Sequence, residues 1–476
     1  MASMTEGQRR LARCAVLTLF VACVGACGNR LSHDRLLADA RADGSQPTSA
    51  ARTTMGGGTA GTSTASAAIG TAGTTPTAGG SAAASGGGPG SDTPTAAAQA
   101  GGGTASGPAC TGSEAPLVIG SVGQQSGLVG NATASGPRTV QAWADDVNSH
   151  GGLNCHPVQY IVVDDGGDPA RHQSLVRELV EQRHVIAFVQ MDAVLTGQSS
   201  VDYLTSHSIP VVGSDLGGPW FYSSPMYFPQ GSSGDLLGRA AIAVGGEIAR
   251  EQGLTNLGSL TCVEATICAS SYDLLPGWAQ EFGLNLVYRG QATLVQPDYT
   301  SVCQAAKSAG VQIFFVNLDP NSMTRLGRSC SSVGFHPQYL GSGVTANSAL
   351  AGDPNLNGMA YSATVIPFMV TSNPSVARFQ AVIAQRAPGL VADGEAIAGW
   401  VSAMVLERIA SHISDPPTSQ SILDGLYTIQ DDDLGGVTGP LTFTAGQNRA
   451  PTLCYFRVRL DGSSFVSPND GARTCI

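Results

Sequence analysis

Short apolar runs alternate with longer segments of helical spacing through most of the chain after residue 115. The first series has strand-like runs at 116–122, 158–163, 185–189 and 209–212, and helical segments at 133–149, 169–182 and 196–206. The second has strand-like runs at 257–260, 284–288 and 313–316, and helical segments at 272–282, 300–309 and 321–333. Repeated strand–helix units require parallel sheets that helices cover on both faces. The pattern therefore predicts an α/β protein with two doubly wound parallel-sheet lobes, separated near residue 235.

Two such lobes also predict where a ligand binds. In open α/β sheets, ligands bind beyond the carboxyl ends of the strands. When two lobes face each other with these ends, the loops after the strands line a common cleft. The candidate binding residues are therefore sought in the loops that follow the strands.

The first 26 residues read as a signal peptide of the lipoprotein type. Arg9, Arg10 and Arg13 precede a short apolar stretch, and small residues precede Cys27. This layout is typical of a secretory signal, and it resembles the lipobox of bacterial lipoproteins, with Cys27 as the lipidated residue. An ordinary cleaved signal with an incidental cysteine is the alternative. We expect a lipid-anchored protein at the outer face of a bacterial cytoplasmic membrane, with residues 27–43 as a stem.

Residues 44–108 consist almost entirely of Gly, Ala, Ser, Thr and Pro. Such a segment cannot bury enough apolar surface to offset the entropy lost on ordering. We therefore predict a disordered tether between the stem and the folded part.

The composition of the chain limits the kinds of partner that it can bind. The chain has 476 residues, 42% of them hydrophobic and 12% charged, with a formal net charge of −11. An acidic chain is a poor nonspecific ligand for nucleic acid, so no nucleic-acid partner is expected. The eleven cysteines are too many for a reducing cytosol.

Eight cysteines follow Cys27, and they lack the Cys-x-x-Cys spacing of a metal or redox site. Their number allows many pairings. The order along the chain suggests one of them, and we expect structural disulfides. The suggested pairs are Cys110 with Cys155, Cys262 with Cys268, Cys303 with Cys330, and Cys454 with Cys475.

From residue 115 onward the chain resembles the extracytoplasmic solute-binding proteins of the leucine/isoleucine/valine-binding family. The most specific segment is Gly151–Leu179, which has the family's Gly-Gly, strand, Asp-Asp, Asp-Pro-Ala and helix in order. The resemblance implies hinge closure on a small solute, a chain that crosses three times between the lobes, and delivery to the permease of an ABC transporter. It places lobe 1 at 115–235 and about 366–445, and lobe 2 at about 236–365 and 446–476.

The resemblance also suggests binding residues in the strand-end loops. In the first lobe these are Gln124, Gln125, Ser126, Asp192, Ala193, Asp215, Leu216 and Gly217. In the second lobe they are Tyr272, Asn317, Asp319 and Ser342. A turn or a helix cap is the alternative role of the loop residues, and core packing is the alternative for Tyr272.

The chain departs from the family where a ligand's amino and carboxylate groups are held. Ala193 and Gly217 stand where hydroxyl residues are expected, and the acid expected near Ser342 is missing. Asp192 and Asp215 lie beside the expected carboxylate site. We therefore predict weak binding of branched-chain amino acids and better binding of a neutral polar or amine-bearing solute.

The sequence lacks common catalytic patterns after the tether, including Gly-x-Ser-x-Gly and His-Glu-x-x-His. We expect a monomeric binding protein without metal or cofactor, not an enzyme. A ligand-sensing receptor of a signalling system is the alternative function. A hydrolase that uses Ser126 is a further alternative, although no base for it is visible.

Overall fold

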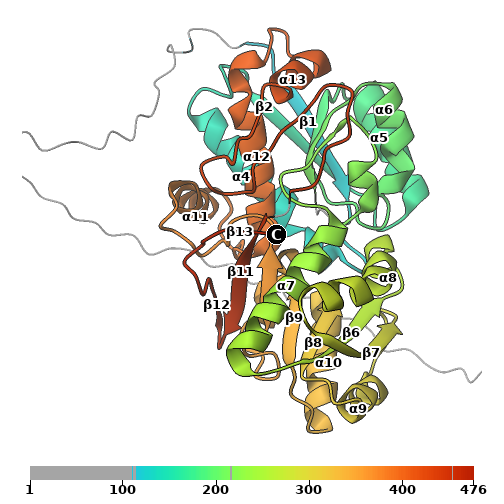
Figure 1. The fold of residues 1–476 in the computed structure, drawn as a ribbon. Helices are drawn as coiled ribbons and strands as arrows, with labels where there is room; N and C mark the ends of the chain where they lie inside the picture. Colours follow the sequence, from blue (N-terminus) through green and yellow to red (C-terminus); the bar gives the residue numbers. More distant parts are fainter. Residues whose placement is uncertain (1–109, 111–113, 215–216, 453) are drawn as a thin grey trace, which may run out of the picture. The chain divides into compact units, whose positions relative to one another are not determined.

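The computed structural model describes residues 110, 114–214, 217–452 and 454–476 (Figure 1). The predicted signal peptide, stem and tether lie outside the described residues, as does Cys27. The same holds for two of the candidate binding residues, Asp215 and Leu216. Within the described part, the mixed α/β fold is confirmed.

The first lobe is built on a five-stranded parallel sheet in the order β2-β1-β3-β4-β5. Its strands are β1 (Leu117–Gly123), β2 (Val158–Asp164), β3 (Ala187–Met191), β4 (Val211–Ser214) and β5 (Tyr227–Phe228). Its helices are α3 (Gly130–Thr133), α4 (Ser135–Ser149), α5 (Pro169–Glu181), η1 (Gly197–Ser200), α6 (Val201–Ser206) and η2 (Pro219–Tyr222). The predicted helix at 133–149 begins at Ser135, and the predicted helix at 196–206 is a 3-10 turn followed by α6.

The second lobe is built on an eight-stranded sheet, with the main order β12-β11-β10-β9-β8-β6-β7. Its strands are β6 (Asn256–Cys262), β7 (Asn285–Ala292), β8 (Ile313–Asn317), β9 (Gln338–Ser342), β10 (Ala360–Ala363), β11 (Cys454–Asp461), β12 (Ser464–Val466) and β13 (Thr474–Cys475). Strands β6 to β10 are parallel, whereas β11 pairs antiparallel with β10, β12 and β13. The antiparallel strands are an addition to the parallel sheet that the alternation of strands and helices predicted.

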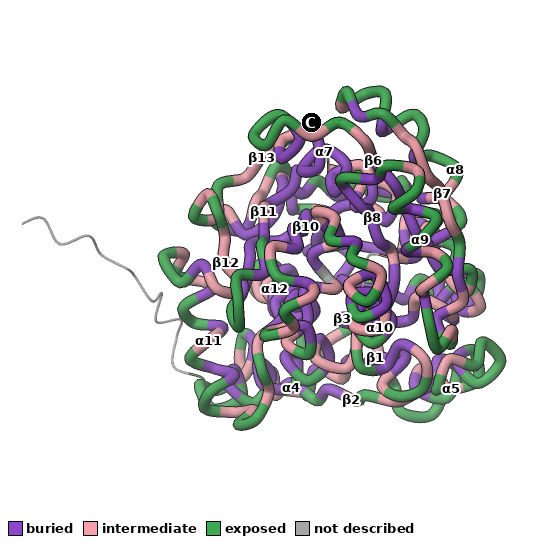
Figure 2. The backbone as a smooth tube through the Cα atoms, turned by 90° about the horizontal axis from the view of Figure 1, so that it is seen from below, coloured by how far each residue is buried: buried purple, intermediate pink, exposed green. Residues whose placement is uncertain are grey.

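Helices cover both faces of each sheet (Figure 1). In the second lobe, α7 (Gly234–Gln252) and α8 (Thr266–Glu281) pack on one face, and α9 (Thr300–Ser308) and α10 (Pro320–Ser332) pack on the other. The remaining elements are η3 (Gly343–Thr345), η4 (Ser348–Leu350), α11 (Pro374–Arg386), α12 (Gly394–Arg408), η5 (Ala410–His412) and α13 (Ser419–Leu426). Figure 2 shows the buried interior, which includes most of α7.

The chain alternates between the two sheets. It leaves the first sheet after β5, and after β10 it returns with α12, which packs on α4 and β4 of the first lobe. It then reaches the second sheet again with β11. Each lobe therefore contains segments that are far apart in the sequence.

Local sequence sets where several helices begin. Asp168, Asp319 and Asn373 each precede a proline, and each side chain accepts a hydrogen bond from a backbone N–H of the helix that follows. Such a residue satisfies a donor that the helix start leaves open, and proline at the first helical position has a suitable φ. The strand-end loops before α5 and α10 are thus fixed by short sequence signals.

Four disulfides cross-link the described part. They join Cys110 to Cys155, Cys262 to Cys268, Cys303 to Cys330, and Cys454 to Cys475. These are the four pairs that the order of the cysteines suggested. Three of them lie in the second lobe, and Cys262–Cys268 joins the end of β6 to the first turn of α8.

Candidate functional site

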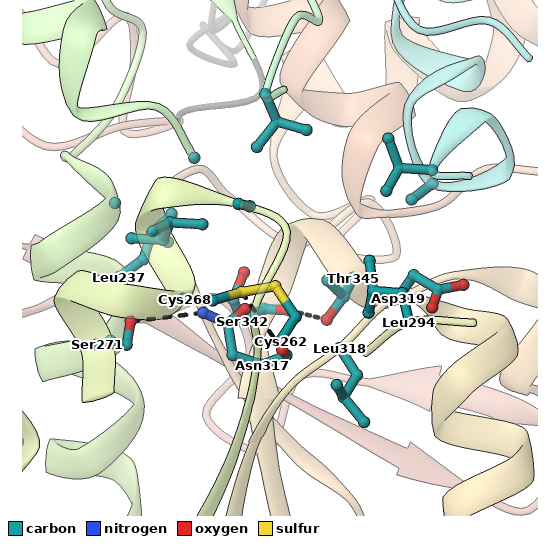
Figure 3. A pocket seen from close by; sticks show the side chains of 18 of the residues that line it. Leu237, Cys262, Cys268, Ser271, Leu294, Asn317, Leu318, Asp319, Ser342 and Thr345 are labelled. Atoms are coloured by element: carbon teal, nitrogen blue, oxygen red, sulfur yellow. Dashed lines mark hydrogen bonds between the residues drawn. A yellow bond between two sulfur atoms is a disulfide. The ribbon is translucent and has the colours of Figure 1, made fainter. Parts of the chain in front are cut away.

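A cavity of about 120 Å³ lies between the two lobes (Figure 3). The first lobe contributes Val129, from the loop after β1, and Val194 and Leu195, from the loop after β3. The second lobe contributes Leu237 and Ile267, at the starts of α7 and α8. Apolar side chains from both lobes thus enclose most of the cavity.

The carboxyl ends of three parallel strands form the second lobe's side of the cavity. Cys262 ends β6, Asn317 ends β8 and Ser342 ends β9, and all three line the cavity. The Asn317 amide nitrogen lies 3.4 Å from Oγ of Ser271, another lining residue. This is the edge at which parallel α/β sheets bind ligands.

The Cys262–Cys268 disulfide is part of the cavity wall (Figure 3). Both cysteines are buried, and Ala265 and Ile267, which lie between them, also line the cavity. The covalent bond therefore holds the first turn of α8 against the end of β6. The position of this part of the wall depends on the disulfide.

The described lining contains two charged residues, and both are acidic. Asp319, at the start of α10, is 7% exposed, and Glu395, in the first turn of α12, is 2% exposed. The Asp319 carboxylate accepts hydrogen bonds from the backbone N–H groups of Asn321 and Ser322. Among the described lining residues there is no lysine, arginine or histidine. The cavity can therefore hold an apolar body with a hydrogen-bond donor or a positive charge.

Gln190 supports Glu395 from behind the cavity. Its amide nitrogen donates to Oε1 of Glu395 at 2.7 Å and to Oδ1 of Asp192 at 2.6 Å. Ser402 Oγ, on α12, donates to Oε1 of Gln190 at 2.5 Å. Gln190 has a φ of 53°, a left-handed conformation that is uncommon for residues other than glycine. The strand end of β3 is thus tied to the start of α12, which carries Glu395.

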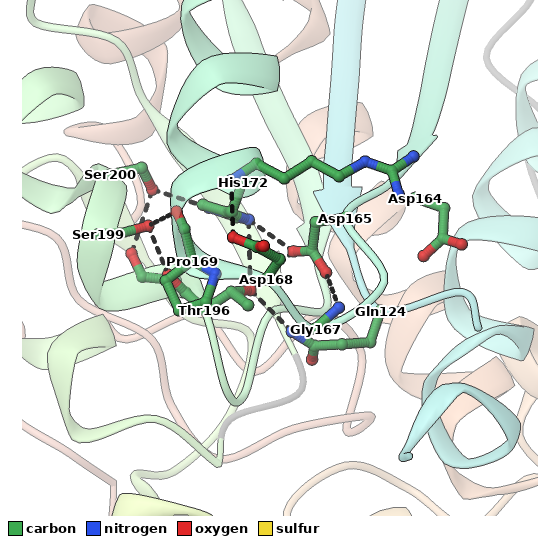
Figure 4. Close-up of polar contacts among 12 residues, drawn as sticks. Gln124, Asp164, Asp165, Gly167, Asp168, Pro169, His172, Thr196, Ser199 and Ser200 are labelled. Atoms are coloured by element: carbon green, nitrogen blue, oxygen red, sulfur yellow. Dashed lines mark hydrogen bonds and ion pairs between the residues drawn. The ribbon is translucent and has the colours of Figure 1, made fainter. Parts of the chain in front are cut away.

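A second buried network holds the loops that follow β1, β2 and β3 together (Figure 4). Gln124 Nε2 donates to Thr196 Oγ1, which donates to Asp165 Oδ2, both at 2.7 Å. His172 lies 2.8 Å from Asp165 Oδ2 through Nδ1 and 3.0 Å from Ser200 Oγ through Nε2. All five residues are buried. The network fixes the turn that presents Val194 and Leu195 to the cavity.

Hydrogen bonding sets the ionisation of Asp165. Burial raises the pKa of this carboxyl group, but hydrogen bonds from His172, Thr196 and the backbone N–H of Gly167 outweigh burial and lower the pKa below its usual value. The order Asp165, His172, Ser200 is that of a serine-hydrolase triad. However, Ser200 has no exposed surface and lines none of the described cavities, so a substrate cannot reach it.

The structure places four of the candidate binding residues in the described lining. These are Gly217, Asn317, Asp319 and Ser342.

The other described candidates lie outside that lining. Gln124, Asp192 and Ala193 are buried beside it. The backbone N–H groups of Gln125 and Ser126 donate to Asp164. Tyr272 packs against Arg289, with the guanidinium carbon 3.9 Å from the ring centre.

Sequence reasoning missed several lining residues that stand near the candidates. Val194 and Leu195 follow Asp192 and Ala193, and Ser271 precedes Tyr272. Glu395 was missed because the candidates were sought in loops that follow strands, whereas Glu395 lies in the first turn of α12. The Cys262–Cys268 pair was recognised as a disulfide, but its place in the wall was not.

One group of described residues has side chains close enough to share a metal ion. The ligand atoms of Glu114, His156 and Asp415 lie within 4.8 Å of one another. Glu114 precedes β1, whose other end faces the cavity loops, so this group stands apart from the cavity. A hydrogen bond and charge repulsion from Asp415 raise the pKa of Glu114.

The chain matches known proteins at the level of family and fold. A family model described as periplasmic binding protein matches residues 116–465. No curated protein matches the chain. Within the described residues, no helix combines the length and apolar character needed to cross a bilayer.

Several solved structures are similar to this chain. A possible leucine/isoleucine/valine-binding protein from Rhodopirellula baltica SH 1 is 16% identical, with a TM-score of 0.65, over 76% of this chain and 98% of that one. An ABC transporter solute-binding protein from R. palustris in complex with benzoate is 15% identical, with a TM-score of 0.63, over 76% of this chain and 98% of that one.

The branched-chain amino acid transporter substrate-binding protein from Streptococcus pneumoniae, in complex with isoleucine, is 14% identical, with a TM-score of 0.63, over 76% of this chain and 99% of that one. At this identity the similar structures support the fold, and the family model covers most of the chain. The two-lobed fold, the cavity at the strand ends and the match over residues 116–465 show that the chain belongs to the periplasmic binding protein family.

Proposed function

We propose that the protein captures a small solute in the cavity between the lobes and delivers it to the permease of an ABC transporter. The cavity carries this proposal, because its wall is made by strand-end loops of both lobes. A solute that contacts both lobes stabilises the closed arrangement by its higher affinity for that arrangement. The permease can then distinguish the loaded protein from the empty one by shape.

The solutes of similar proteins support a small organic ligand. The R. palustris protein is in complex with benzoate and the S. pneumoniae protein with isoleucine. For this chain we propose that Asn317, Asp319 and Ser342 contact the solute from the second lobe and that Gly217 faces it from the first. The lining favours a solute with an apolar body and one polar group, whereas the sequence led us to expect a neutral polar or amine-bearing solute.

We further propose that the protein works outside the cytoplasm, anchored by lipid on Cys27. The basic start and the small residues before Cys27 support this placement. The four disulfides support an oxidising compartment.

We propose that the protein works without a catalytic step. Ser126, the residue considered for a hydrolase, donates to a carboxylate oxygen of Asp164. Among the described residues, no histidine is hydrogen-bonded to Ser126.

A screen for ligand-induced thermal stabilisation tests the proposal. The purified protein is scanned with amino acids, amides, polyamines, sugars, aliphatic amines and carboxylates, because a ligand that binds the folded state raises its stability. Hits are then measured by calorimetry. The transport step is tested by the ATPase activity of the reconstituted permease, which the loaded protein should stimulate more than the empty protein.

Two matched variants test whether a hit binds in the cavity. Leu195→Trp places a large ring in the lining and should abolish binding. Leu274→Trp places the same ring at a position that is 43% exposed and lies outside the described cavities, and it should leave binding unchanged. If no solute stabilises the protein, or if Leu195→Trp binds as the unchanged protein does, the proposed site is wrong.

A further inference from the structure

We infer that the solute is an apolar amine, recognised by a buried carboxylate from each lobe, and that the cavity discriminates against carboxylate ligands. This inference rests on the proposed solute-binding function and adds the chemical class of the solute. Its three supports are the charges in the cavity wall, the lobes that carry them, and the apolar character of the rest of the wall.

Asp319 and Glu395 are the acidic residues of the described lining, which includes no basic side chain. Both are at least nine-tenths buried. Water is largely excluded there, so charge interacts more strongly than at the surface. A ligand ammonium gains from either carboxylate, whereas a ligand carboxylate meets like charge without a cationic partner.

The two acids also belong to different lobes. Asp319 caps α10 of the second lobe, and Glu395 lies in the first turn of α12, which packs on the first lobe. Backbone N–H groups of Asn321 and Ser322 hold the Asp319 carboxylate, and Gln190 holds that of Glu395. Both carboxylates are therefore oriented before a ligand arrives, so little further ordering is needed on binding. An ammonium between them would favour the closed arrangement of the lobes.

Most of the rest of the wall is apolar, although Asn317 and Ser342 add polar groups from the second lobe, so the cavity favours a solute with an apolar body. Val129, Val194 and Leu195 face the cavity from the first lobe, and Ile267 and Leu294 face it from the second. A polar body such as a sugar would lose its hydrogen bonds to water without replacing them on these side chains. A short branched or straight hydrocarbon chain makes no hydrogen bonds to water that could be lost, and its transfer from water to the cavity is favourable.

One feature of the wall favours a negatively charged ligand. Helix α8 begins at the cavity, and its N-cap residue Ala265 has no side chain able to accept a hydrogen bond from the helix start. A helix start attracts negative groups, but its effect is equivalent to about half an elementary charge. Two full carboxylates outweigh it. Ala193 and Gly217, which follow β3 and β4, carry no hydroxyl that could hold a ligand carboxylate.

Three molecules with the same hydrocarbon body test the inference. Isopentylamine is cationic at neutral pH, isopentyl alcohol is neutral and isovalerate is anionic. Their binding to the full-length protein is measured by calorimetry at one ionic strength. We expect isopentylamine to bind at least tenfold more tightly than isopentyl alcohol, about 1.4 kcal/mol, and isovalerate to bind more weakly than the alcohol.

Charge-neutral variants identify the groups responsible. Glu395→Gln and Asp319→Asn keep the size of each side chain, and asparagine can still cap α10. Each variant should reduce the preference for the amine over the alcohol to less than threefold, with alcohol binding unchanged. Asp393→Asn is the matched control, because this buried acid lies two residues before Glu395, outside the described lining. It should retain the preference.

The outcomes separate this inference from the proposed function. Isovalerate binding as tightly as the amine overturns the inference, as does an amine preference that survives in both variants, or the absence of binding by all three molecules. The proposed function still stands in those cases if another solute from the screen binds and Leu195→Trp abolishes that binding. If no solute of any class binds, both proposals are wrong.

Discussion

The Cys262–Cys268 disulfide should affect solute binding more than its small loop suggests. Its two cysteines are separated by 6 positions, whereas Cys303 and Cys330 are separated by 27. Closing a loop in the unfolded chain stabilises a protein by about 2 kcal/mol for the shorter loop and about 3.5 kcal/mol for the longer one. By loop length alone, the Cys303→Ser/Cys330→Ser variant should be the less stable of the two double variants.

Solute affinity should change in the opposite order. The Cys262–Cys268 bond holds the first turn of α8 in the cavity wall, so its removal should weaken binding by tenfold or more, about 1.4 kcal/mol. Cys303 and Cys330 are fully buried between α9 and α10 and lie outside the described lining. Their replacement should leave the affinity of the remaining folded protein within about twofold.

The assay combines two measurements on the same preparations. Urea unfolding gives the free energy of unfolding, and calorimetry with the tightest solute of the screen gives the affinity at a temperature where each variant is folded. A Cys262→Ser/Cys268→Ser variant that binds as tightly as the unchanged protein would refute the role of this disulfide in the wall. Equal losses of affinity in both double variants would show that the effect is not specific to the Cys262–Cys268 disulfide.

Three further predictions concern the first lobe and the anchor. Asp165→Asn should lower the free energy of unfolding by about 2–4 kcal/mol at neutral pH, because it weakens charged hydrogen bonds of a buried network. Folding lowers the pKa of Asp165, so the stability that its ionised carboxylate contributes is lost as the pH falls below about 4. The difference in unfolding free energy between Asp165→Asn and the unchanged protein should therefore shrink in acid. A difference that stays constant down to pH 2 would contradict the lowered pKa of Asp165. Gly399→Val should destabilise the first lobe by about 1–3 kcal/mol or more in thermal unfolding, because even a Cβ there would lie 2.4 Å from the Gly136 carbonyl oxygen. Cys27→Ser should move the protein from the membrane fraction to the soluble fraction, and unchanged membrane association would argue against lipidation.

The sequence was sufficient to predict the elements that have a clear hydrophobic period. The alternating strands and helices up to residue 333 are present in the expected order, with ends shifted by a few residues. Helix α12 escaped prediction because it is buried almost all round, so it lacks an amphipathic pattern. Helix α7 was also not predicted. The antiparallel pairing of β11 with β10 was not predicted, because the alternation of strands and helices indicated a parallel sheet.

The candidate site was predicted to the level of the loop, not of the side chain. A strand's end identifies the loop that reaches the cleft, and Asn317 and Ser342 lie at such ends. Within a loop, the local backbone path decides which side chain faces the cavity. After β3 it presents Val194 and Leu195 in place of Asp192 and Ala193, which makes this part of the wall apolar.

The interleaved path of the chain has a consequence for its biosynthesis. Helix α4 packs against α12, which follows it by more than two hundred residues, and β10 of the second lobe pairs with β11, near the end of the chain. A ribosome must therefore make nearly the whole polypeptide before either lobe can complete its core. Contacts between such distant segments form slowly, since a long loop must close first. The nascent chain thus cannot complete its fold during most of its synthesis, and a chain that is not fully folded can be threaded through a secretion channel.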